Sequence, residues 1–519
     1  MGKCFRVLAL LAVICVSNVT HAGLPNEELM CLEPQSELDR FRFLRSAALD
    51  ITGTVPPMEW NEELQELEDV PEAWIDDLLD MPEFADRVVR WHRAMVWNNL
   101  SLVRLYNTRN IIREASGVYW VGGGRSTTFR GTNIACNNVP VGYNVDGSIV
   151  TDEEGREGYR WIQPHWLPPG EQIKVCAFDA QDVDFSASGN DCSQDGAATD
   201  AGCGCGPNLI YCGPRALETQ IQQAFVEDLN KRVRRIITNN LPYTELFTSQ
   251  KAYVNGPIVR YWKSMANFAG GVRNTPVPMQ IESLPDLDSW QIDEWVEVDL
   301  PPSHAGILTS PAWLLRFQTN RGRASQFQTQ FLCAPLKAQG TLPTSDAAIQ
   351  AEPNLQKKEG CNTCHAVLEP VSAYWGRWTE AGAGHLYEDD FPALNTECYT
   401  CATTGLACSA DCNRYYKVKA YHPDEQEFLG QLSWYLFQTE GNQKNVEEGP
   451  ALLALLEVAG NRLPECAAKT AAQRMLGRDL LEDEQGWVDE LVVTFAGSSF
   501  SYRELVKAIV MSPIYRRML

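Results

Sequence analysis

Apolar side chains recur three and four positions apart near the start of the chain. This spacing predicts an amphipathic helix that begins at a Ser36 cap, continues through Leu38, Phe41 and Leu49, and stops at Gly53. A serine cap and a glycine stop both satisfy helix ends, where backbone groups lack intrahelical partners.

Two prolines mark the next helices. Pro71 and Pro82 stand where a first helical turn tolerates proline, because the missing amide would have no intrahelical partner there. Amphipathic segments follow them and end near Met81 and Asn98. The N-terminal region is therefore predicted to be helical.

The pattern changes between residues 117 and 214. Gly, Asn, Asp, Thr and Pro become frequent, helical periodicity disappears, and the alternating run 172–178 predicts a strand. Six cysteines fall in this stretch: Cys136, Cys176, Cys192, Cys203, Cys205 and Cys212. We expect a Cys- and Gly-rich loop-and-strand insertion cross-linked by disulfides.

Helical periodicity returns in residues 215–240 and 311–336, and again from Pro423 to the end of the chain. Residues 276–302 are acidic and aromatic and are expected to be irregular. The predicted fold is mainly α, with helical domains on both sides of the remaining segment, residues 341–395.

The first 22 residues have the three parts of an export signal. Lys3 and Arg6 form a positive region, residues 7–16 are apolar, and small residues lead to a cleavage site after Ala22. No later apolar segment reaches transmembrane length. We expect a periplasmic or secreted protein, in the cell envelope, without a transmembrane span.

The chain carries a formal net charge of −23, and loss of the signal would remove two cations and no acid. Such an acidic surface repels nucleic acid and anionic membranes. A nucleic-acid partner is therefore excluded from the expected functions.

The segment that begins at Gly360 contains a C-x-x-C-H motif formed by Cys361, Cys364 and His365. Two thiols one helical turn apart can each add to one haem vinyl group, and the adjacent imidazole then binds the iron from the proximal side. The motif predicts one covalent haem c, with His365 as an iron ligand.

Three other interpretations of the motif are weaker. A thioredoxin-like redox pair would follow a strand, and residues 356–359 do not form one. A zinc site would need two more ligands, and a plain disulfide would make His365 a coincidence. Haem is preferred because thioether attachment takes place outside the cytoplasm, where the export signal would send the chain.

The sixth iron ligand has several candidates. His385 follows an aromatic stretch that could form one wall of a haem pocket, Met475 lies in a helical pattern, and His422 is a third option. An open sixth position is the fourth. His385 is preferred over Met475.

A second haem is not expected. Cys398 and Cys401 have the right spacing, but Ala402 occupies the histidine position, so two disulfides with Cys408 and Cys412 are preferred over a metal site. Of the 17 cysteines, two would leave with the signal and two would hold haem, which leaves an odd number. At least one further thiol is therefore expected outside intramolecular disulfides.

These features together predict seven segments. They are a signal peptide (1–22), an N-terminal helical domain (23–115), the insertion (116–214), a helical domain (215–340), the haem-attachment segment (341–395), a small Cys-rich loop (396–415) and a C-terminal helical domain (416–519).

The motif and its flanking segments resemble the planctomycete-type cytochrome C domain family, large exported proteins with several domains of unknown function around one C-x-x-C-H. The likeness is carried by residues 43–57, 75–79, 305–309, 368–370 and 505–513. The family usually has Asp-Pro followed two residues later by Gly, whereas Glu369 and Pro370 are followed here by Val371 and Ser372.

The resemblance implies a haem-binding, electron-transferring role with an unknown redox partner. An enzyme that uses haem as a peroxidase-like or oxidase-like centre is the first alternative, because 519 residues exceed what a one-haem carrier needs. A secreted binding scaffold with a structural haem is the second, and its support is the Cys-rich insertion.

Overall fold

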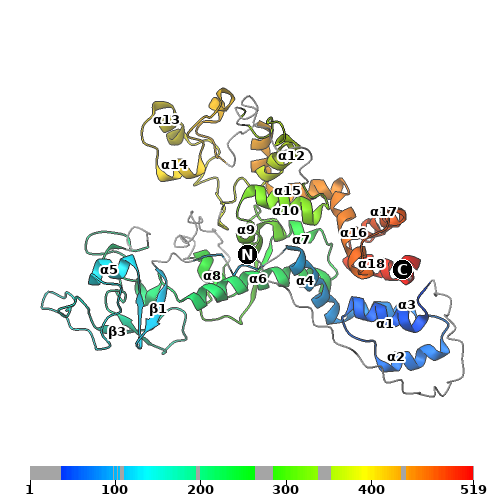
Figure 1. The fold of residues 1–519 in the computed structure, drawn as a ribbon, viewed down its shortest axis with the longest axis horizontal. Coiled ribbons are helices and arrows are strands. Elements are labelled where there is room, and N and C mark those ends of the chain that lie inside the picture. Colours follow the sequence, from blue (N-terminus) through cyan, green and yellow to red (C-terminus); the bar gives the residue numbers. More distant parts are fainter. Residues whose placement is uncertain are drawn as a thin grey trace, which may run out of the picture.

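The structure is a computed structural model in which a helical body carries two smaller Cys-rich lobes (Figure 1). It describes residues 37–96, 99–101, 103–105, 110–193, 199–263, 284–336, 352, 354–380, 382–433 and 440–517. In Figure 1 the insertion lies at one end of the molecule, and α1–α3 lie with the C-terminal helices at the other.

The first and the last helices that the structure describes lie together at one end of the helical body. The N-terminal helices are α1 (Arg40–Ile51), α2 (Met58–Glu63), α3 (Glu72–Asp80) and α4 (Pro82–Val96). The C-terminal helices are α15 (Glu440–Ala459), α16 (Arg462–Leu476), α17 (Gln485–Gly497), α18 (Tyr502–Val510) and α19 (Pro513–Arg516). Lys507 pairs with Asp76 across the two sets, and the Tyr515 hydroxyl donates to Asp50 at 2.6 Å.

The first helix begins later than the apolar spacing indicated. Asp39 is the N-cap of α1, and its carboxylate accepts from the amides of Phe41 and Arg42 at 3.0 Å. The predicted cap, Ser36, lies outside the described residues. Gly53 follows the C-cap with a φ of +82°, which agrees with its predicted role as the stop.

The long helix α6 (Arg215–Thr238) runs through the middle of the molecule, where the sequence predicted a helix (Figure 1). The other helices of the body are α7 (Glu245–Thr248), α8 (Gly256–Lys263), α9 (Pro311–Arg316) and α10 (Asn320–Phe331). The single helical stretch predicted at 311–336 is thus two helices. The irregular stretch predicted at 276–302 contains a strand, β6 (Val296–Asp299), that pairs antiparallel with β5 (Lys251–Val254).

The insertion is a small mixed sheet with the strand order β1-β2-β4-β3. Its elements are β1 (Ile112–Ala115), β2 (Val118–Val121), α5 (Gly124–Arg130), β3 (Tyr159–Ile162) and β4 (Ile173–Cys176). The predicted strand is present as β4, whereas β1 lies just before residue 116 and α5 has no counterpart in the sequence pattern. Disulfides Cys136–Cys176, Cys192–Cys203 and Cys205–Cys212 cross-link it, as predicted.

Helix α12 (Asn362–Ala373) comes next along the chain and packs against α10 and α15. The second Cys-rich lobe follows with α13 (Thr396–Thr404) and α14 (Ala410–Tyr415). Its disulfides are Cys398–Cys412 and Cys401–Cys408, so the preference for disulfides over a metal is confirmed. A sixth disulfide, Cys333–Cys466, joins the end of α10 to α16.

The six disulfides fit an extracellular or periplasmic protein, because such bonds persist in oxidising compartments. Among the described residues, none of the helices combines the length and the apolar character needed to cross a membrane. The predicted signal peptide, residues 1–22, lies outside the described residues.

Candidate functional site

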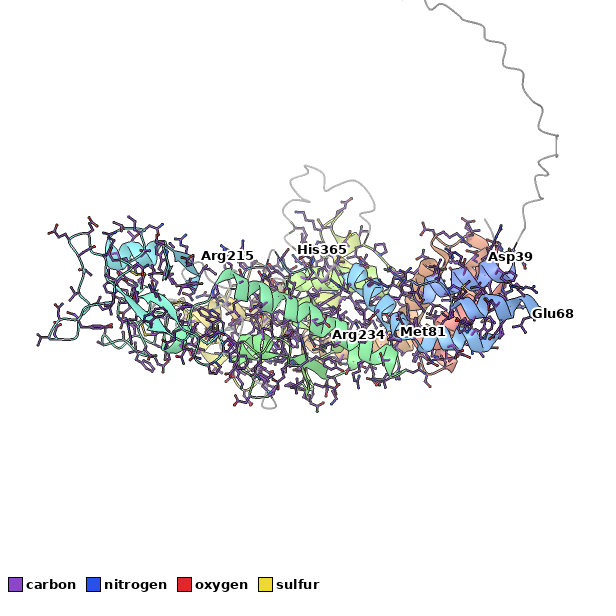
Figure 2. The ribbon with its side chains drawn as sticks, turned by 90° about the horizontal axis from the view of Figure 1, so that it is seen from below. Asp39, Glu68, Met81, Arg215, Arg234 and His365 are labelled. Atoms are coloured by element: carbon purple, nitrogen blue, oxygen red, sulfur yellow. A yellow bond between two sulfur atoms is a disulfide. The ribbon has the colours of Figure 1, made fainter. Side chains whose placement is uncertain are left out.

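The C-x-x-C-H motif forms the start of α12. Cys361 is the N-cap of the helix, and its carbonyl accepts from the amides of Cys364 at 3.2 Å and His365 at 3.0 Å. These bonds place the two thiols one turn apart on a short, defined piece of backbone. Figure 2 shows His365 near the middle of the long axis of the molecule, between Arg215 toward the insertion and Asp39 at the other end.

The two cysteines of the motif differ from all the others that the structure describes. Fourteen cysteines are described, and twelve of them form the six disulfides. Cys361 and Cys364 form none, and both are half-buried. Cys31, the remaining cysteine after the predicted signal, lies outside the described residues. Thiols in this position have the reduced state and the access that haem attachment requires.

The imidazole of His365 is held from behind by a carboxylate. Its Nδ1 lies 2.5 Å from Oε1 of Glu369, one helical turn further along α12. The same oxygen accepts from Nε of Arg321 at 2.9 Å. Because guanidinium groups only donate, this oxygen acts as an acceptor, and the imidazole accordingly donates through Nδ1. Nε2 makes no hydrogen bond to the part of the chain that the structure describes, so its lone pair is available to a metal.

Burial and charge act in opposite directions on Glu369. Its side chain is fully buried, and loss of hydration raises the pKa of the carboxyl group. The hydrogen bond from His365 and the charge of Arg321 oppose this shift. The His365 ring is only 21% exposed, so the pair lies at the boundary between the helical body and the surface.

Helix α15 holds both α12 and the residues that follow it. Asn445 of α15 donates to the carbonyl of Pro370 at 3.0 Å, and Arg377 forms two bonds to Glu447 of α15. Pro370 lies inside α12 and has no amide to offer to the carbonyl of Ala366, which follows His365. The helix is therefore supported by its neighbours next to the motif, where its own bonding is incomplete.

His385, the preferred sixth ligand, is buried in an aromatic setting. Its ring packs edge-on against Trp378 and Tyr387, and burial lowers the pKa of the imidazole to about 3. Trp378 lies beyond the C-terminal end of α12, and His365 precedes that end by eight residues, or about 12 Å of helix. No hydrogen bond or ring contact joins the two imidazoles in the described ranges, so this assignment stays a prediction.

The other two candidate ligands lie in different surroundings. Met475 is buried in α16 within the large hydrophobic core, where a methionine fills space. His422 is exposed, and its ring accepts from the amide of Asp424. No hydrogen bond, ion pair or ring contact joins either side chain to His365 in the described residues, and both assignments also stay predictions.

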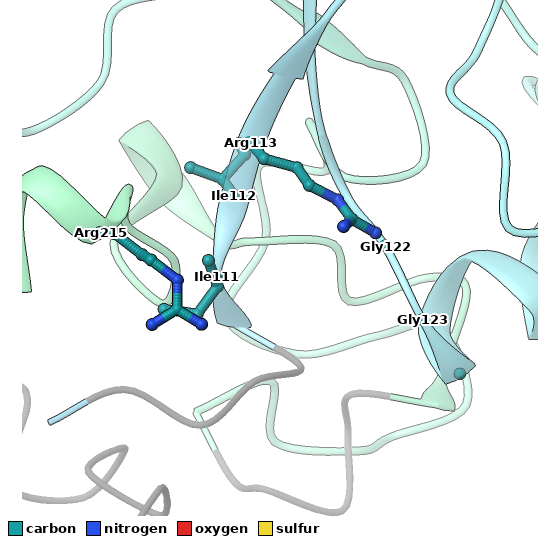
Figure 3. A pocket seen from close by; sticks show the side chains of 7 residues that line it. Ile111, Ile112, Arg113, Gly122, Gly123 and Arg215 are labelled. Atoms are coloured by element: carbon teal, nitrogen blue, oxygen red, sulfur yellow. The ribbon is translucent and has the colours of Figure 1, made fainter. Parts of the chain in front are cut away.

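A pocket beside the insertion does not contain the motif. It has a volume of about 520 Å³ and lies where the insertion meets α6 (Figure 3). Arg113 extends across Gly122 on one side, and Arg215 lies on the other (Figure 3). Its lining of Ile, Gly and Arg offers no thiol, imidazole or carboxylate, so the candidate site is the start of α12.

The sequence signalled one of the two residues that support His365. Glu369 lies four residues after the histidine, which is the spacing at which helical side chains meet, so its contact was predictable once a helix was assumed. Arg321 comes from α10, 48 positions earlier than Glu369, and no local pattern indicates that pairing.

Comparison of the chain with protein-family models, with curated proteins and with solved structures finds no match.

Proposed function

We propose that the chain is an exported haemoprotein that binds one c-type haem through Cys361, Cys364 and His365 and transfers electrons. The proposal depends on one observation about the motif. Among the described cysteines, its two are the ones that form no disulfide, and the adjacent histidine binds Glu369 through Nδ1, which leaves Nε2 on the opposite side of the ring. The resemblance to planctomycete-type cytochromes supports the same role.

Each residue has a defined part in the attachment. Cys361 and Cys364 would hold the haem through thioethers: each thiol would exchange its S–H bond for an S–C bond to a vinyl group, with the hydrogen going to the neighbouring vinyl carbon, so no oxidant would be consumed. His365 supplies the proximal nitrogen, and Glu369 holds the ring in place. A haem bound here would supply a one-electron Fe(III)/Fe(II) couple.

The proposal is tested with the full chain, expressed for export in a host with a c-haem maturation system. We expect a reduced c-type visible spectrum and haem that remains with the protein on a denaturing gel. Replacement of both Cys361 and Cys364 by alanine should abolish the retained haem. The matched control replaces Cys401 and Cys408, which form a disulfide, by alanine. This variant should retain the covalent haem.

A haem-free wild-type protein, with maturation supplied, would refute the proposal. Carbon monoxide then separates the two haem functions. An electron carrier with two protein ligands should keep its reduced spectrum when the gas is added. A rapid spectral change would show an open sixth position and favour the enzyme alternative, which His365→Ala should then inactivate in peroxide-dependent dye oxidation.

A further inference from the structure

The carboxylate behind His365 belongs to a built arrangement of three side chains. Glu369 is fully buried, and its Oε1 receives both the imidazole Nδ1 of His365 at 2.5 Å and Nε of Arg321 at 2.9 Å. Its second oxygen, Oε2, is buried and has no hydrogen-bond partner among the described residues. Both hydrogen bonds that the described residues make to this carboxylate therefore reach the same oxygen.

The supporting helix α10 fixes the position of Arg321. Thr319 caps this helix by accepting from the amide of Gly322, and the amide of Asn320 donates to Glu380 at 2.8 Å. Arg321 itself is 37% exposed, so water weakens its charge relative to that of the buried carboxylate. The carboxylate consequently outweighs the guanidinium at the imidazole.

We propose that Glu369 is a positioning residue that lowers the reduction potential of iron bound at His365, and that Arg321 moderates this effect. The proposal rests on the proposed haem attachment. A carboxylate that accepts the Nδ1 proton makes the imidazole more basic, and a more basic ligand stabilises ferric iron relative to ferrous iron. Arg321 withdraws part of that charge and acts in the opposite sense.

The electron balance is simple. On reduction the iron takes one electron from an external reductant, dithionite in the experiment, and passes from Fe(III) to Fe(II). In this scheme His365 keeps its Nδ1 proton, Glu369 stays a carboxylate, and no bond of the protein forms or breaks. The three side chains would thus shift the equilibrium between Fe(III) and Fe(II) without changing the number of electrons or protons exchanged.

The test is a spectroelectrochemical titration of the exported haem protein and three variants. Glu369→Gln keeps the shape and removes the charge, and should shift the reduction equilibrium at least tenfold toward ferrous iron, which is 59 mV for one electron. Arg321→Gln should shift it in the opposite direction. Glu369→Asp keeps the charge and should lie between the wild type and Glu369→Gln.

Opposite signs separate tuning from loose structure, because a misplaced His365 would move both variants in the same direction. Potentials that are unchanged, or that move together while the haem stays covalently attached, would overturn the inference and leave the proposed function intact. Absence of attached haem in the wild type would overturn both. If Glu369→Gln does not fold, the partly exposed Arg321→Gln decides the question by its sign.

Discussion

His92 shows how a single buried polar side chain is accommodated in the helical body. Its Nδ1 donates to the carbonyl of Val88 at 2.9 Å, so Nε2 accepts from the hydroxyl of Tyr243 at 2.9 Å. The neutral ring therefore makes both hydrogen bonds without placing a charge in the core. Burial accordingly lowers the pKa of His92 to about 4.

This shift predicts an acid-labile fold. Between pH 6.5 and about 4 the unfolded His92 binds a proton that the folded ring does not, so the free energy of unfolding should fall with decreasing pH. The expected slope is about 1.4 kcal/mol per pH unit, or about 3 kcal/mol over the window. Denaturant titrations at several pH values under non-reducing conditions measure it.

The variant His92→Gln should lose this part of the slope. His422→Gln is the matched control, because its ring is exposed in the folded protein and its loss should leave the slope at the wild-type value. Equal slopes in the wild type and His92→Gln would show that other groups account for the acid sensitivity.

Some residues of the candidate site could be predicted from the sequence, and others could not. The thiols of Cys361 and Cys364 follow from the motif, since a C-x-x-C next to histidine has a chemical reason to stay out of disulfides. Residues 368–370, which include Glu369, belong to the family-like segments. The contact of Glu369 with His365 could be predicted only if these residues were known to form a helix. Arg321 required the packing of α10 on α12, which is a tertiary contact that local pattern does not encode.

At the scale of elements, a buried ion network connects α5 to the sheet of the insertion. Arg130 of α5 donates to Glu157 at 2.8 Å and to Asp179 at 3.2 Å, and all three side chains are fully buried. Asp179 also accepts from the amide of Val121 in β2 at 3.0 Å. One cation thereby connects four segments of an insertion whose apolar core is small.

Removal of this cation should be costly. Arg130→Met keeps most of the volume but leaves buried Glu157 without its cation and Asp179 with Arg125 alone, and we expect a loss of about 3–5 kcal/mol in the free energy of unfolding. Thermal unfolding with intact disulfides is the measurement. Arg156→Met, which breaks a surface pair with Glu154, should cost less than about 1 kcal/mol. Similar losses in the two variants would contradict the network's role.

Periodicity predicted those elements whose faces divide clearly between core and solvent. The helix α6 begins at Arg215 as expected, and α4 begins at Pro82. The short helix α5 was missed because it buries Arg125, Ser126 and Arg130, so its inner face is polar and gives no apolar repeat. Strands β5 and β6 have four residues each, too few for alternation to emerge from the surrounding sequence.

The whole molecule combines one large core with lobes that are cross-linked. A single hydrophobic cluster extends through both the N-terminal and the C-terminal helices. The insertion and the lobe around α13 have only small clusters of their own. Five of the six disulfides lie in these two lobes, as expected where apolar burial alone is insufficient.

The sixth disulfide should contribute most per bond. Cys333 and Cys466 are 133 residues apart, and closing so long a loop lowers the entropy of the unfolded chain, which stabilises the fold by about 5 kcal/mol. The seven-residue separation of Cys401 and Cys408 corresponds to about 2 kcal/mol. Replacement of each pair by alanine, followed by thermal unfolding without reductant, compares them. A larger loss for the Cys401–Cys408 pair would contradict this ranking.

The same bond has a topological consequence. Between Cys333 and Cys466 the chain forms a closed covalent ring that contains α12 with the C-x-x-C-H motif and the entire second Cys-rich lobe. A protease that cuts once inside this ring opens it without separating the two products. The nicked protein should migrate as one species on a non-reducing gel and as two after reduction. The segment that carries His365 therefore stays tethered to the body after a first cleavage.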